Sequence, residues 1–296
     1  MSNSITLAIV GCGNLGTAIL SGILKSSIDS NASKIPNHDT NIQRYIACIS
    51  TPESVERIKK TLGHLAGHVE IMQGRNTEAI ALADYIILGC KPNKVQDILQ
   101  EDGIAEALEG KVLISICAGV TVLQMQSYIP SHTTCRIVRV MPNTASAVHQ
   151  SMTVIENSNP PLPSTTSAFI NWIFKQIGIV INLPPSQLDV ATALCGSGPA
   201  FFALILESAI DGAVAMGLPR AEATLMASQT MKGTAEMVLA GEHPAILKDK
   251  VSSPGGCTTG GLTVLEEGAV RGKFAGAVKQ ATIVAGQLGN RTKMIR

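Results

Sequence analysis

The feature that most constrains this sequence is a glycine-rich turn between an apolar run and a helical pattern. Residues 6–10 are apolar and β-branched, which predicts a buried strand. The segment Gly11-Cys12-Gly13-Asn14-Leu15-Gly16 follows at once and opens a helical pattern that we expect to reach Lys25. The spacing is G-x-G-x-x-G in the strand–turn–helix context that dinucleotide binding requires.

Each glycine of this turn has a physical role in such a site. Gly11 permits the tight turn, Gly13 lets the backbone approach a pyrophosphate, and Gly16 lets the helix lie close to the sheet. The first turn of the helix adds free amides and a partial positive charge. We therefore expect a bound dinucleotide; the alternative is a glycine-rich turn without a ligand.

The first part of the chain alternates predicted strands with predicted helices, which indicates a parallel, doubly wound α/β sheet of the Rossmann type. Strands are expected at 6–10, 45–50, 69–71, 85–90, 111–116, 136–140, 152–156 and 179–183. Helices are expected at 14–25, 52–62, 77–82, 93–101 and 164–176. The polar segment 26–44 is interpreted as a long surface loop, and as an insertion.

After Pro184-Pro185 the strand patterns stop. Helices are expected at 188–218, 220–239, 244–250, 259–267 and 271–288, with a break at 195–199. We therefore predict a dinucleotide-binding domain at 1–184 and an α-helical domain at 185–296. The many small apolar residues in this half suit close helix packing between subunits.

Composition narrows the classes of partner and compartment. The net charge of +1 gives no basic field for nucleic acid or an anionic membrane. Charged residues are only 15%, below the ~25% of typical globular chains; this favours a homo-oligomer, although one well-buried core is the alternative. Seven cysteines without a CxxC pair indicate a reducing compartment. With no signal-peptide pattern and no metal-site motif, we expect a cytoplasmic protein without a metal.

The end of the second strand bears on the choice of cofactor. Ser50-Thr51 stands where a carboxylate would bind a ribose 2′-hydroxyl. The two hydroxyls, with Arg57 nearby, can bind a 2′-phosphate instead, which favours NADPH, with NADH as the second choice. Alternatively, Ser50 and Thr51 cap the helix at Pro52. Lys91, after the fourth strand, can contact the cofactor or face solvent.

A second glycine-rich turn, at residues 252–261, lies directly before a predicted helix. Exposed amides and the hydroxyls of Ser253 and Thr258 would bind a carboxylate there. A flexible loop with a capping threonine is the alternative.

Taken together, these motifs resemble the pyrroline-5-carboxylate reductase family. The resemblance covers essentially the whole chain, in order. It rests on residues 10–16, 91–92, 117–121, 139–144, 196–200, 216–220 and 247–256.

The resemblance implies reduction of L-1-pyrroline-5-carboxylate to L-proline by two interlocked subunits, which can form larger rings, with an active site shared between subunits. Cofactor contacts carried over by position are Cys12, Asn14, Leu15, Thr51, Asn76, Cys90, Lys91 and Ala118. Substrate contacts would be Ser253, Gly256, Cys257 and Thr258, with the Thr258 hydroxyl on the ring nitrogen. Cys257 replaces a threonine that is usual in relatives.

Two other functions fit the same scaffold. One is a non-catalytic NADPH-binding regulator, against which the intact Ser253–Thr258 turn argues. The other is a reductase of another small cyclic imine acid, or of a β-hydroxyacid. A β-hydroxyacid enzyme would need a catalytic lysine on the long helix, and residues 188–218 contain none.

Overall fold

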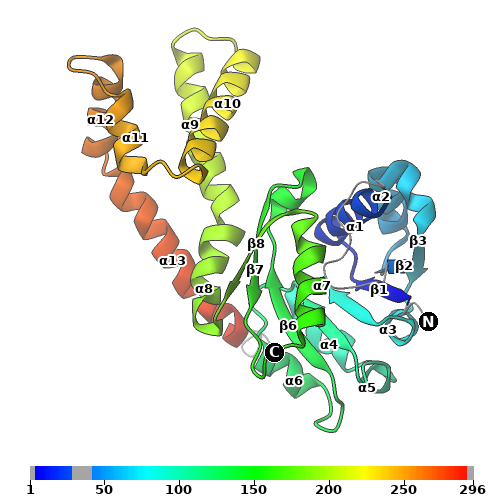
Figure 1. The fold of residues 1–296 in the computed structure, drawn as a ribbon. Coiled ribbons are helices and arrows are strands. Elements are labelled where there is room, and N and C mark those ends of the chain that lie inside the picture. The colour runs from blue at the N-terminus through cyan, green and yellow to red at the C-terminus, as the bar shows by residue number, and fades with distance from the viewer. Residues whose placement is uncertain (1–3, 29–41, 292–296) are drawn as a thin grey trace. The chain divides into compact units, whose positions relative to one another are not determined.

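The computed structural model describes residues 4–28 and 42–291, and its chain divides into two compact units (Figure 1). The first unit comprises residues 1–196 and the chain from Thr282 onward, and the second comprises residues 197–281. The boundary expected after residue 184 stays a prediction. Residues 29–41 of the expected loop and insertion at 26–44 lie outside the described residues. The expectation is wrong at its two ends, since residues 26–28 continue the helix Asn14–Ile28 and residues 42–44 begin the strand Ile42–Ile49.

An eight-stranded sheet forms the centre of the first unit, in the order β3-β2-β1-β4-β5-β6-β7-β8. The strands are β1 (Ile5–Val10), β2 (Ile42–Ile49), β3 (Val69–Gln73), β4 (Tyr85–Leu88), β5 (Val112–Ser115), β6 (Arg136–Met141), β7 (Ser151–Glu156) and β8 (Gly178–Leu183). All eight expected strands are present, with boundaries that differ by a few residues. The doubly wound α/β fold is confirmed.

The expectation of a wholly parallel sheet is wrong at one pair of strands. β7 runs antiparallel to β6, whereas the other neighbouring pairs are parallel. The connection from β6 to β7 contains only a short 3₁₀ helix, Thr144–Val148. A parallel crossover needs about a dozen residues or more, so this short connection must return the chain in the opposite direction.

Helices cover both faces of the sheet. They are α1 (Asn14–Ile28), α2 (Pro52–Leu62), α3 (Asn76–Leu82), α4 (Val95–Leu99), α5 (Ile104–Ala107), α6 (Val122–Tyr128) and α7 (Ser164–Lys175). The sequence reasoning missed α5 and α6. The start of α6 nevertheless has a recognisable signal, because Thr121 and Gln124 form a reciprocal capping box.

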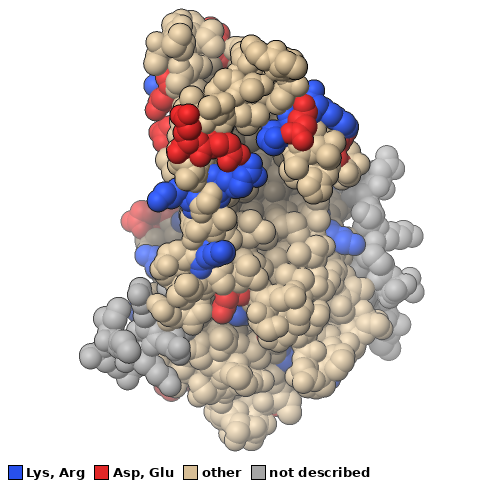
Figure 2. All heavy atoms as spheres, turned by 90° about the vertical axis from the view of Figure 1, so that its left-hand side faces the viewer, with Lys and Arg blue, Asp and Glu red and all other residues tan. Residues whose placement is uncertain are grey.

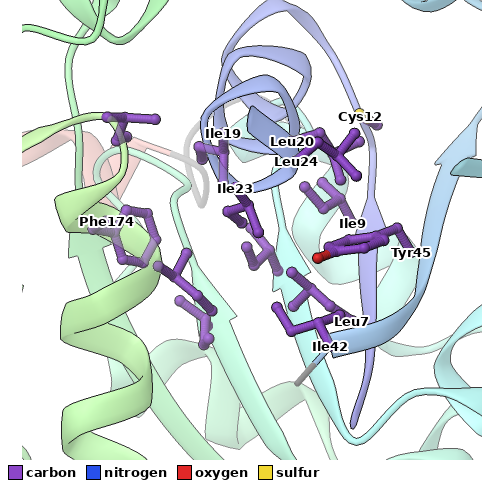
Figure 3. Packing of buried hydrophobic residues seen from close by; sticks show 14 of the residues in the cluster. Leu7, Ile9, Cys12, Ile19, Leu20, Ile23, Leu24, Ile42, Tyr45 and Phe174 are labelled. Atoms are coloured by element: carbon purple, nitrogen blue, oxygen red, sulfur yellow. The ribbon is translucent and has the colours of Figure 1, made fainter. Parts of the chain in front are cut away.

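Two apolar layers hold this sheet between its helices. Leu7 and Ile9 of β1 pack against Ile19 and Ile23 of α1, with Phe174 of α7 in the same layer (Figure 3). The alternate residues of β1 belong to the opposite layer, which α3 to α6 cover. Because both faces are buried, β1 is apolar at nearly every position, and its carboxyl end is firmly held.

Helices make up the chain after β8. They are α8 (Leu188–Ala191), a π-helix at Thr192–Gly196, α9 (Gly198–Ala215), α10 (Arg220–Leu239), α11 (Pro244–Val251), α12 (Cys257–Glu267) and α13 (Val270–Arg291). The break expected at 195–199 is thus a π-helical turn, and Pro199 lies in the first turn of α9. Proline is tolerated there because the first amides of a helix have no intrahelical partner.

The second unit buries few of its apolar side chains. Phe202, Leu204, Leu225 and Leu265 are among the large hydrophobic residues that are exposed. By length and composition alone, the helical stretch Pro185–Ala215 could cross a membrane, and 17% of its most apolar window is buried. Figure 2 shows broad areas of surface formed by uncharged residues, which include polar as well as apolar ones. The exposed large hydrophobic side chains suit contact with another apolar surface.

Candidate active site

The cofactor residues predicted from the sequence gather at one edge of the sheet. β1 to β5 are mutually parallel, so their carboxyl ends meet at this edge. The predicted residues directly follow those strand ends: Gly11, Cys12, Gly13, Asn14, Leu15, Gly16, Ser50, Thr51, Asn76, Cys90, Lys91 and Ala118. β1 is also where the strand order reverses, which is the usual position of a nucleotide in such sheets.

The three glycines of the turn at this edge have different surroundings. Gly11 has a φ of 74°, and a Cβ on it would lie 2.7 Å from the Cα atom of Cys90. A Cβ on Gly13 would meet nothing closer than the Gly11 oxygen at 4.0 Å. On Gly16 it would lie 3.0 Å from Ile9. Packing therefore requires glycine at position 11 and disfavours a larger residue at position 16, whereas the space beside Gly13 is open, as the close approach of a pyrophosphate to the backbone needs.

Arg57 of α2 links this turn to the end of β2. Its Nη2 donates a 2.8 Å hydrogen bond to the carbonyl oxygen of Cys12, and its Nη1 donates to Ser54 Oγ at 3.2 Å. Thr51 Oγ1 lies 3.2 Å from the same Ser54 oxygen. The buried Nε of Arg57 has no partner within residues 4–28 and 42–291. A cation thus stands beside both the glycine turn and the Ser50-Thr51 position.

Thr51 occupies the N-cap position of α2, as the alternative interpretation expected. Its side chain, however, makes no hydrogen bond to a backbone amide of that helix. The hydroxyls of Ser50 and Thr51 are exposed, so a helix cap alone does not account for them. Lys91 is also exposed and precedes a 3₁₀ turn at Pro92–Lys94, which leaves both of its expected roles open.

Asn76 is held in place by two residues that the sequence reasoning missed. The Cys48 thiol donates to Asn76 Oδ1 at 3.1 Å, and Asn76 Nδ2 donates to Glu101 Oε1 at 2.9 Å. These partners are 28 and 25 residues away along the chain. No local sequence pattern could have paired them.

Two thiols face one another at the ends of β4 and β5. The sulfur atoms of Cys90 and Cys117 are 3.9 Å apart. The hydrogen bond to Cys117 and burial both raise the pKa of Cys90. Cys90 therefore stays neutral at physiological pH, and neutral thiols are poor nucleophiles. The geometry gives Cys90 a packing role beneath the Gly11 turn.

The predicted substrate turn has a compact structure of its own. Gly255 adopts a φ of 68°, and Gly256 caps α12. The amide of Gly256 and the hydroxyl of Thr259 both donate to the carbonyl oxygen of Ser253, at 3.0 and 2.9 Å. A Cβ on Gly256 would displace the Ser253 hydroxyl and would lie 3.1 Å from the Ser253 carbonyl oxygen, so a larger residue there would disturb the turn.

The start of α12 differs from the expectation in a way that matters for binding. The helix begins at Cys257, not at residue 259, and Thr258 is not its cap. Cys257 and Thr258 therefore lie in the first helical turn, where backbone amides have no intrahelical acceptor. The half-buried Thr258 hydroxyl has no hydrogen-bond partner in the described part of the chain. The exposed thiol of Cys257 lies beside it.

Proteins of one family match this chain over nearly its full length. Residues 185–288 match the family model for pyrroline-5-carboxylate reductase dimerisation, and residues 6–119 match that for coenzyme F420-dependent NADP oxidoreductases. A pyrroline-5-carboxylate reductase from Lophium arboricola is 54% identical, over 97% of this chain and 94% of its own. The chain belongs to the pyrroline-5-carboxylate reductase family. The resemblance drawn from the sequence motifs is confirmed.

Other pyrroline-5-carboxylate reductases match as completely. The Schizosaccharomyces pombe protein is 40% identical over 95% of this chain and 98% of its own. The crystal structure of Plasmodium falciparum pyrroline carboxylate reductase with NADP bound superposes with a TM-score of 0.80 at 30% identity, covering 98% of this chain and 99% of that one. This chain is accordingly an oxidoreductase.

Proposed function

We propose that this chain reduces L-1-pyrroline-5-carboxylate to L-proline, with the dinucleotide at the carboxyl edge of the sheet and the substrate carboxylate at the start of α12. The observation that carries the substrate assignment is the turn at Ser253–Thr258. It combines free helix-terminal amides with a threonine hydroxyl that has no partner in the described residues. Helix N-termini of this kind stabilise bound carboxylates.

The residues at the sheet edge fit NADPH, which supplies the hydride when it is bound. The amides of Asn14 and Leu15 open α1 and would hold the pyrophosphate. Ser50, Thr51 and the Arg57 guanidinium would hold the 2′-phosphate. No carboxylate follows β2 directly, which favours NADPH over NADH.

Positioning is the main contribution of the chain to the reaction. Within the turn at Gly256–Thr258, the amides of Cys257 and Thr258 fix the carboxylate of the cyclic imine, and the Thr258 hydroxyl hydrogen-bonds to the ring nitrogen. If the imine enters protonated, its ring nitrogen already carries the proton that the product amine needs, so the site needs no strong acid and Thr258 orients the nitrogen. Holding two reactants in a productive geometry can supply a large part of a rate enhancement.

The proposed macromolecular partner is a second copy of the chain, and such dimers can assemble into larger rings. The proposed function involves neither nucleic acid nor a membrane. The dimerisation match at 185–288 includes the exposed apolar helices α9 and α10. Such a partner would cover Pro185–Ala215 without a bilayer. We also propose a cytoplasmic location, since all seven cysteines are free thiols, as in a reducing compartment.

The test is NADPH oxidation by the purified protein with pyrroline-5-carboxylate, with NADH in parallel and proline measured as product. We expect imine-dependent oxidation that yields proline and is faster with NADPH. Tight NADPH binding without oxidation would contradict the proposal and indicate the non-catalytic regulator. NADPH oxidation with a different cyclic imine acid, and none with pyrroline-5-carboxylate, would show that the other acid is the substrate.

A further inference from the structure

A cavity of about 800 Å³ lies within the first unit, away from the cofactor edge. It is lined by α6, by residues at the amino ends of β5 and β6, by the segment after β7, and by Pro185 and Asp189. The cofactor residues follow the carboxyl ends of β1 to β5. No residue proposed to bind the dinucleotide or the substrate lines this cavity.

Arg139 of β6 lies in the wall of this cavity. The residue is only 5% exposed, and its buried Nε has no hydrogen-bond partner among the described residues. Its nearest opposite charge is Glu156, with Nη1 3.8 Å from Oε2, which is too far for a hydrogen bond. A buried guanidinium with unsatisfied donors is costly. A planar carboxylate from a ligand would supply the missing acceptors.

Two carboxylates share the cavity with Arg139 and with a second, exposed arginine, Arg136 of β6. Glu156 comes from the end of β7 and Asp189 from α8. Burial raises the pKa of Glu156, the Arg139 charge opposes this rise, and the Asp189 charge adds to it. A phosphate or a simple carboxylic acid would therefore meet negative charge as well as Arg139. A ligand that carries both a carboxylate and an ammonium group would pair with the positive and the negative side chains of the cavity.

The remaining lining suits a small aliphatic body. Val122, Leu123 and Ile137 provide apolar surface, and Thr121 and Gln126 provide polar groups. Leu123 is 78% exposed although it is a large hydrophobic residue. An aliphatic group bound in the cavity would cover part of this surface.

We propose that this cavity is a binding site for a free α-amino acid, whose carboxylate binds Arg139 and whose ammonium group binds Glu156 and Asp189. The side chain of the ligand lies against Leu123 and Ile137. The proposal rests on the first unit alone, so it stands whether or not the proposed reaction is correct.

The test uses the full-length protein and L-leucine as the probe, with calorimetric titration as the readout. Two matched compounds each keep half of the ligand: 4-methylpentanoate lacks the ammonium group, and 3-methylbutylamine lacks the carboxylate. We expect leucine to bind at least tenfold more tightly than either compound. Equal affinity for leucine and 4-methylpentanoate, or no leucine binding, would overturn the proposal.

Substitutions then locate the site. Asp189 is half-buried, so Asp189→Asn is expected to fold and to weaken leucine binding at least fivefold. Asp102→Asn removes an exposed carboxylate that does not line the cavity, and it should leave binding unchanged. Arg139→Gln should abolish binding, but it removes a buried charge and can fail to fold; the Asp189 result decides in that case. An unchanged affinity in Asp189→Asn overturns the proposal.

Discussion

Arg57 Nη2 donates a 2.8 Å hydrogen bond to the carbonyl oxygen of Cys12. This contact joins α2 to the glycine-rich turn across 45 residues of sequence. It places a guanidinium group at the point where the ends of β1 and β2 come together. The same side chain can therefore hold the turn and neutralise a 2′-phosphate.

Replacing Arg57 by Met separates these two roles. A hydrogen bond from a charged donor contributes about 1.5–3 kcal/mol, so we expect Kd for NADPH to rise roughly tenfold or more. The loss for NADH should be smaller, because NADH has no 2′-phosphate. Fluorescence titration with both cofactors measures this, and Lys59→Met on the exposed face of α2 is the control. An equal loss of affinity for both cofactors would show that Arg57 only holds the glycine-rich turn and does not bind the 2′-phosphate.

Two alanine substitutions in the glycine turn should have different effects. Gly11→Ala places a Cβ 2.7 Å from the Cys90 backbone at a φ of 74°, and such strain costs about 1–3 kcal/mol or more. We expect a lower Tm without cofactor. Gly13→Ala meets open space, so it should keep the wild-type Tm and lose NADPH affinity. Thermal melts with and without NADPH distinguish the two, and a low Tm for Gly13→Ala alone would contradict the assignment.

Thr258 and Thr259 are adjacent, but their hydroxyls have different surroundings. The Thr259 hydroxyl donates to Ser253, whereas the Thr258 hydroxyl has no partner in the described structure. Thr258→Ala should lower kcat/KM roughly 10- to 100-fold, and Thr258→Ser should restore most of it. Thr259→Val should act mainly on KM by loosening the turn. Full turnover by Thr258→Ala with unchanged KM would remove Thr258 from the mechanism.

The Cys257 thiol allows the same turn to be modified by a thiol reagent. Its thiol is exposed, while those of Cys12, Cys48 and Cys117 are buried. N-ethylmaleimide at neutral pH should modify Cys257 and block the proposed carboxylate site, with loss of most turnover. Cys257→Ser should stay active through the treatment, as a steady-state assay would show. Equal inactivation of this variant would place the sensitive thiol elsewhere.

Burial raises the pKa of the Cys12 thiol to about 11, from an ordinary value of 9.0. The folded state therefore holds this proton more tightly than the unfolded state does. The resulting stability is complete below pH 9 and is lost as the pH rises towards 11, by an amount of about 2–3 kcal/mol. Denaturant unfolding from pH 8 to 11 should show a smaller loss of unfolding free energy in Cys12→Ala than in the parent. Parallel losses would show that Cys12 does not contribute.

The sequence was most informative where structure depends on neighbouring residues. The turn at Gly11–Gly16 and the turn at Ser253–Thr258 could both be predicted, because glycine spacing and helix starts are local properties. The strands could be found for a similar reason, since burial on both faces leaves continuous apolar runs. The capping box at Thr121 and Gln124 was also local, and it was overlooked.

The remaining features depend on contacts between distant segments. The bond from Arg57 to Cys12 and the fixing of Asn76 by Cys48 and Glu101 require the strand order to be known first. The reversed direction of β7 depends on the length of one connection and not on the composition of the strand. These features arise only when the sheet brings segments that are distant in sequence side by side.

The reversed direction of β7 places loops that follow strands at both edges of this sheet. Because β7 and β8 run against β6, their carboxyl ends lie with the amino end of β6. An ordinary doubly wound sheet offers loops at the ends of its strands to one crevice only. Here the loops after β7 and β8 are directed to the other side, where they line the cavity proposed to bind an amino acid. Substitutions in these loops therefore change that cavity and leave the nucleotide crevice as it is.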